Sequence, residues 1–329
     1  MKSFEKNYGS VINWNVGALC CHDEFMLKLL DKFQQYQVPH SVKYVFGSIP
    51  CALQGGRLLG EIKDHAVKFD SKYNVAYAFD MFRRYNNHGI GCRLTFSHTA
   101  LEPELFQDKQ SNALLSYLNS SPVSSTGIKN GVIVTDLRLA EYIRKNYPNL
   151  ELICSIVGTS SRCILGKTDT IDYYKQMLEL FDLVVLNPGR NTDFEFLNDL
   201  PDHDRFEIMA NHACVKNCPT AKIHYEAQQR LVKASLDGDQ QTINAENEKL
   251  ARIKRHCQEY HELNPLDGCS LNDEEMKQIV SMGFINYKLE GRDNSTNFLM
   301  RDIGQYLFQQ NLYARFVQAT MSCYMRMYE

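Results

Sequence analysis

The sequence lacks any run approaching the roughly 18 apolar residues that a membrane-spanning helix needs, and its first residues, MKSFEKNYGSVINW, contain no signal-peptide core. It also lacks an excess of positive charge, since 36 lysines and arginines are set against 39 aspartates and glutamates. These absences argue against a membrane protein and against a dedicated nucleic-acid binder. They predict a cytoplasmic protein in which any contact with RNA is local.

Several catalytic motifs are missing as well. No GxGxxG follows an expected strand, so nothing supports a dinucleotide site. The sequence contains no HExxH, no GxSxG and no convincing Cys-His arrangement, which leaves a hydrolase without an evident nucleophile or water-activating metal. Internal repeats and low-complexity segments are also absent.

Cysteine, in contrast, is plentiful. There are eleven, an odd number, in a chain of 329 residues that is too long and too rich in expected helices for a disulfide scaffold. Reduced thiols, with a subset that binds metal, account for them better.

The hydrophobic pattern alternates short apolar strands with amphipathic helices. Strands are expected at 11–18, 41–48, 92–97, 131–135, 150–157, 182–186, 205–210 and 283–289. Such alternation requires parallel pairing, because each helix crosses back over the sheet. Eight strands predict a (β/α)8 TIM-like barrel forming one domain over 1–329, with an open doubly wound sheet as the alternative. A helical insert at 221–263, broken near Asp237-Gly238, and a C-terminal helix over 297–329 complete the prediction.

In a barrel, functional groups lie in the loops that follow the strands. The polar residues at these positions are His22, Ser48, His98, Asp136, Arg162, Asn187, Arg190, Asn211, His212, Glu290 and Arg292. Asp136 is expected to cap the helix that follows it. Arg190, which follows Asn-Pro-Gly, is placed either to bind an anion or to lie on the surface.

The stretch FEIMANHACVKNCPTAKIH, residues 206–224, predicts a site. An apolar strand ends in a polar corner and is followed by Cys214 and Cys218. Together with Cys257 and Cys269 they form the pattern C-x3-C-x38-C-x11-C, and four thiols suit a [4Fe-4S] cluster or a tetrahedral zinc ion. The pattern matches no zinc ribbon. One of His224, His256 and His261 could replace a thiol, and the competing interpretation is unpaired core cysteines.

Three short pieces carry a family resemblance. A strand ending in NHAC, a later strand ending in YKLEGR and an early strand running into FGSIP resemble the peptidase U32 family over roughly residues 40–295. The resemblance implies a barrel and, in several branches, four cysteines that hold a [4Fe-4S] cluster. Cys214 would correspond to the first cluster cysteine, and Glu290 and Arg292 to the Glu-Gly-Arg ending. The family leaves six residues between its first two cysteines, whereas this chain has three and lacks the flanking glycines.

Activities in this family comprise oxygen-independent hydroxylation of RNA bases or quinone precursors and, in one branch, collagen degradation. We therefore expect an iron-sulfur hydroxylase or related redox enzyme that acts on a small anionic or RNA-base substrate. A protein of the same family is a candidate partner. Arg190 and Arg292 would bind an anionic group, and Glu290 would manage protons or orient Arg292. His212 is a further candidate catalytic residue. The alternatives are a peptidase-type hydrolase and a non-catalytic binding protein stabilised by zinc.

Overall fold

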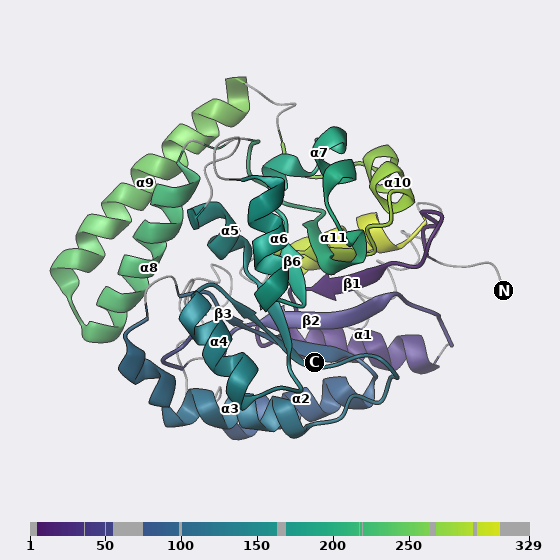
Figure 1. The fold of residues 1–329 in the computed structure, drawn as a ribbon, viewed down its shortest axis with the longest axis horizontal. Coiled ribbons are helices and arrows are strands. Elements are labelled where there is room, and N and C mark those ends of the chain that lie inside the picture. The colour runs from purple at the N-terminus through teal and green to yellow at the C-terminus, as the bar shows by residue number, and fades with distance from the viewer. Residues whose placement is uncertain are drawn as a thin grey trace.

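The protein is described by a computed structural model that covers residues 5–35, 37–49, 51–54, 75–98, 101–162, 169–216, 218, 220–263, 268–291 and 295–309 (Figure 1). Within these residues, eight parallel strands pair in sequence order and close into a barrel. The strands are β1 (Asn13–Val16), β2 (Val42–Gly47), β3 (Gly91–Phe96), β4 (Gly131–Val134), β5 (Glu151–Cys154), β6 (Leu183–Val185), β7 (Phe206–Met209) and β8 (Asn286–Leu289). β8 pairs with β1, so the predicted (β/α)8 barrel is confirmed.

Helices connect the strands on the outside of the ring. They are α1 (Asp23–Gln35), α2 (Val75–Asn87), α3 (Lys109–Ser120), α4 (Leu137–Asn146), α5 (Ile156–Arg162), α6 (Ile171–Leu180), α7 (Phe194–Asp199), α8 (Ala221–Asp237), α9 (Gln240–Leu263), α10 (Asp273–Ser281) and α11 (Thr296–Leu307). None of these helices combines the length and the apolar character needed to cross a membrane.

Side chains at the helix starts explain where several helices begin. The Asp136 carboxylate accepts a hydrogen bond from the Arg138 amide at 2.9 Å, so the expected cap of α4 is confirmed. Thr170 caps α6 through the Tyr173 amide at 3.2 Å. Asn272 forms a capping box with Glu275 at the start of α10.

The predicted helix pair in 221–263 is also present. α8 ends at Asp237, and Gly238 follows in a left-handed conformation with φ of 71°, which is favourable for glycine at this position. α9 then returns antiparallel to α8. Figure 1 shows the pair standing beside the barrel, on the side toward which the β1 and β2 arrows point.

Several expected boundaries differ from those of the structure, among them the start of β8, which lies at Asn286 rather than at 283. Two of the differences have a plain cause. The strand expected over 150–157 ends at Cys154, because Ile156 already begins α5. The helix expected over 297–329 ends at Leu307, because Phe308 adopts an extended backbone and pairs with Glu5 in an antiparallel bridge. The remainder of that expected helix, residues 310–329, lies outside the described residues.

Candidate functional site

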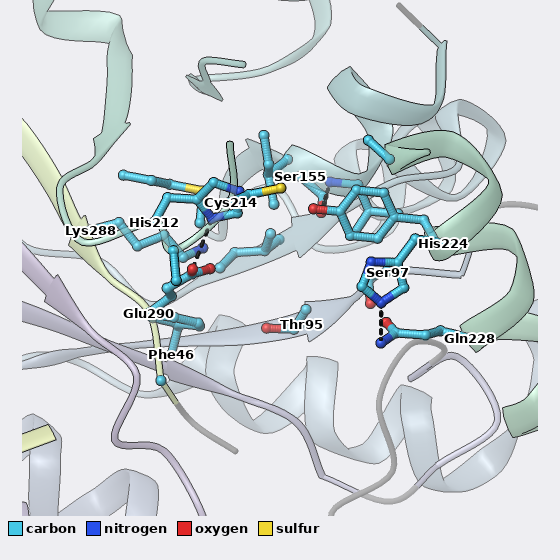
Figure 2. Close-up of a pocket in the computed structure, with 18 of the residues that line it drawn as sticks. Phe46, Thr95, Ser97, Ser155, His212, Cys214, His224, Gln228, Lys288 and Glu290 are labelled. Atoms are coloured by element: carbon cyan, nitrogen blue, oxygen red, sulfur yellow. Dashed lines mark hydrogen bonds and ion pairs between the residues drawn. The ribbon is translucent and has the colours of Figure 1, made fainter. Parts of the chain in front are cut away.

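A pocket of about 430 Å³ lies at the carboxyl ends of the strands (Figure 2). Its floor and walls come from β2, β3, β4, β7 and β8 and from the residues that follow β5, and α8 and α9 form one side of it. Gln229 of α8 donates a hydrogen bond to the Ser97 carbonyl oxygen at 3.4 Å, which joins α8 to the segment after β3. The helix pair therefore borders the pocket at the mouth of the barrel.

Below the pocket, the barrel interior contains a chain of charged side chains. Arg93 of β3 donates to Glu207 of β7 at 2.8 Å and to Glu151 of β5 at 2.7 Å. Because β3 and β7 are not neighbours in the ring, the contact with Glu207 crosses the interior. Asn15 of β1 also donates to Glu207, at 2.9 Å. The Lys288 ammonium lies 3.6 Å from the second Glu207 oxygen.

Apart from Glu151, which is partly exposed, these groups are shielded from solvent, and they hold one another in place. Glu207 is 0% exposed and Arg93 is 1% exposed. The Arg93 guanidinium stacks over the Tyr44 ring at 3.4 Å, and the Lys288 ammonium lies 4.0 Å from the centre of the Phe46 ring. Since Lys288 also lines the pocket, the interior charges fix a cation at the pocket floor.

An acid–base pair stands at the end of β7 and β8. His212 Nδ1 lies 2.8 Å from Glu290 Oε1, and Figure 2 shows the two side chains facing each other. Asn211 fixes this geometry, because its amide donates to the Glu290 carbonyl oxygen at 2.9 Å and accepts from the Glu290 amide at 2.8 Å. The same amide donates to Asp302 of α11 at 2.7 Å. The pair can exchange a proton with a bound molecule.

The four predicted cysteines come together next to this pocket. The Cys269 amide donates to the Cys214 carbonyl oxygen at 2.9 Å, so these two segments run side by side. Cys218 Sγ lies 3.4 Å from the Thr220 hydroxyl, and that hydroxyl lies 4.0 Å from Cys257 Sγ on α9. Cys214 and Cys257 both line the pocket.

The ionisation of the thiols reflects their proximity. The hydrogen bond between the Cys214 and Cys218 thiols lowers the pKa of Cys218 to about 5, with a contribution from Thr220, and raises the pKa of Cys214. Burial raises the pKa of Cys269 to about 12, and the charge of Cys218 contributes. Burial also raises the pKa of Cys257, again with a contribution from Cys218. Cys218 thus interacts with all three other thiols.

The four thiols are not arranged to hold a single metal ion. Zinc with bonds of about 2.3 Å to sulfur would require four sulfurs within about 4 Å of one another. Within the described part of the chain, no group of three or more His, Cys, Asp or Glu side chains is placed to hold a metal ion.

Only some of the predicted site residues line the pocket. His212, Glu290, Cys214 and Cys257 line the pocket, whereas Arg190 does not. Arg190 instead binds Asp169 at 3.0 Å and Asp193 at 2.6 Å and stacks on the Phe196 ring. Its charge is therefore neutralised within the fold. Arg292 lies outside the described residues.

Several pocket and floor residues were not predicted as part of the site, and they share a signal in the sequence. Arg93, Glu207 and Lys288 are charged residues in the middle of strands whose burial is otherwise continuous. A charge in a buried strand requires a partner inside the protein, so it marks an interior network. Tyr225 of α8, which was not predicted, also lines the pocket, as does His224, which was predicted as a possible replacement for a thiol. Only the structure shows that this face of α8 turns toward the barrel.

Comparisons with known proteins give one distant likeness. No protein-family model matches the sequence, and no curated protein is significantly similar to it. The chain is similar to a solved structure described as that of a U32 peptidase, with a TM-score of 0.46 and 15% identity. The likeness covers 88% of this chain and 97% of that chain.

Proposed function

We propose that the protein is an iron-sulfur redox enzyme in which Cys214, Cys218, Cys257 and Cys269 hold a [4Fe-4S] cluster beside the substrate pocket. The observation that carries the proposal is the convergence of these four thiols, separated by up to 55 positions along the chain, around Cys218. Lys216 adds support, because its positive charge lies within electrostatic range of Cys269 and would help to balance an anionic cluster.

The pocket supports a reaction of the oxygen-independent hydroxylase type. A bound cluster supplies one-electron transfer. His212 and Glu290 are placed to hold or move a proton at the pocket wall, and Lys288 offers a fixed positive charge at the floor. α8 limits the access of water from the side of the helix pair. A small anionic or nucleic-acid-derived molecule suits this combination, and a related protein could act as partner.

The proposal includes a cytoplasmic location, where thiols stay reduced. It assigns no role to Arg190, because that arginine is neutralised outside the pocket. Arg292 keeps its proposed role in binding an anionic group.

Anaerobic purification followed by iron and sulfide analysis tests the proposal. Brown protein with about four iron atoms per chain would support it. Zinc at one atom per chain, with unfolding upon chelation, would favour the zinc-stabilised binding protein instead. Cleavage of denatured collagen by metal-free protein would favour the peptidase.

A further inference from the structure

Lys288 is a buried lysine that lines the pocket. It lies in β8, where every residue is buried, and it is 4% exposed. The lining of the pocket also includes the apolar side chains of Phe46, Ile133 and Met209. Among the described residues that line the pocket, no other is a lysine or an arginine. A molecule that enters the pocket therefore meets a single amine, at its floor.

The surroundings of Lys288 have two features that activate a lysine as a nucleophile. Loss of hydration in an apolar pocket and a second cation nearby both favour the neutral amine. Lys288 is almost fully buried, and the Arg93 guanidinium binds the same carboxylate, Glu207. Arg93 makes the closer contact, 2.8 Å from Oε1, whereas the Lys288 nitrogen lies 3.6 Å from Oε2. Among the described residues, no donor forms a hydrogen bond with Oε2, so this oxygen can take a proton.

A protonated imine would suit this place as well as the resting ammonium does. Condensation of an ammonium with a carbonyl compound releases water and leaves one positive charge on the nitrogen. Glu207, which is 0% exposed, and the Phe46 ring face the ammonium and would face the iminium in the same way. The buried charges stay balanced, so the reaction leaves no charge uncompensated.

Thr95 offers a hydroxyl to a carbonyl compound in the same pocket. It lines the pocket from β3 and is 6% exposed (Figure 2). Its hydroxyl oxygen has no hydrogen-bond partner among the described residues. A buried hydroxyl without a partner costs free energy, and a carbonyl oxygen would accept its proton.

We propose that the pocket binds a small ketone or aldehyde covalently, as an imine with Lys288. The ammonium first passes a proton to Glu207, and the nitrogen then attacks the carbonyl carbon. A second proton moves from the nitrogen to the carbonyl oxygen, and the hydroxyl group so formed leaves as water with the proton from Glu207. A C=N bond thus replaces the C=O bond, and nothing is oxidised or reduced. The inference uses the pocket but not the cysteines, so it does not depend on a metal.

Reduction with borohydride tests the proposal, because it converts an imine into a stable secondary amine. The full chain is incubated with pyruvate or with 2-butanone and reduced, and the adducts are located by peptide mass spectrometry. Lys288→Arg keeps the positive charge and removes the amine. Lys222→Arg, at an exposed lysine of α8, is the matched control.

We expect wild-type protein and Lys222→Arg to carry one reduced adduct, on Lys288, with at least one of the two ketones. Lys288→Arg should carry none. Thr95→Val should form the adduct roughly two- to tenfold more slowly, as expected for the loss of one hydrogen bond.

An unmodified Lys288 in wild-type protein with both ketones would overturn the inference, and so would adducts spread over exposed lysines such as Lys222. Both results are read from wild-type protein, so they do not require Lys288→Arg to fold. A wild-type rate in Thr95→Val would overturn the role of Thr95. None of these results bears on the proposed function, which the iron content tests separately.

Discussion

Substitution of Glu207 by glutamine probes the charges inside the barrel. The change keeps the size of the side chain and removes the negative charge that balances Arg93 at 2.8 Å and Lys288 at 3.6 Å. Both cations are almost fully buried, so neither can recover its hydration. Arg93 keeps its ion pair with Glu151 at 2.7 Å, so the change removes one of its two carboxylate partners together with the carboxylate 3.6 Å from Lys288. Removing one partner of a buried ion pair typically costs about 3–5 kcal/mol.

This cost converts into a measurable shift in melting temperature. An unfolding entropy of about 2.1 cal/mol/K per residue gives roughly 0.7 kcal/mol/K for the whole chain, so Glu207→Gln should lower the melting temperature by about 4–7 °C. Circular dichroism on heating, with a urea titration at 25 °C, measures the loss. Glu141→Gln, at an exposed position on α4, is the control and should change little. A Glu207→Gln melting temperature equal to that of the wild type would refute the reasoning.

Three further predictions concern other parts of the chain. Gly47→Ala should lower the free energy of unfolding by about 1–3 kcal/mol in a urea titration, because the added Cβ would clash with the Leu19 carbonyl oxygen. Gly268→Ala is the control and should leave the free energy of unfolding unchanged, because its added Cβ meets open space. Equal losses in the two variants would contradict the prediction. In metal-free, reduced protein, iodoacetamide should label Cys218 with a midpoint near pH 5, as followed by peptide mass spectrometry, since the Cys214 thiol and Thr220 lower the Cys218 pKa to about 5. A midpoint near pH 9 would contradict that assignment. Burial, together with the charge of Lys43, lowers the pKa of His40 from 6.5 to about 4. As the pH drops from about 6.5 to 4, the unfolded chain therefore binds this proton before the folded chain does, and the free energy of unfolding should fall. His40→Gln should flatten this fall in urea titrations across that range, and an unchanged slope would contradict it.

The fold could be predicted because its signals are local. Each strand is a short apolar run, and the break between α8 and α9 coincides with Asp237-Gly238, where glycine adopts a left-handed conformation. The end of α11 could not be predicted, because Phe308 leaves the helix to pair with Glu5 at the other end of the chain. That pairing depends on tertiary contact rather than on local propensity.

The site could be predicted only in part, for a similar reason. Cysteines and polar residues after strands mark His212, Glu290 and the four thiols directly in the sequence. Which mouth residues face the pocket depends on how the loops fold, and Arg190 turns toward Asp169 instead. The partnership of Arg93 with Glu207 arises only when the ring closes and brings opposite strands together across the interior.

The iron content of protein purified without oxygen tests the central claim most directly. We predict about four iron and four sulfide ions per chain, with the content sharply reduced when Cys218, the thiol that interacts with the other three, is replaced by serine. Cys92→Ser, at a buried cysteine in β3, is the matched control and should retain the iron. Colourless wild-type protein without iron, prepared under the same anaerobic conditions, would contradict the claim.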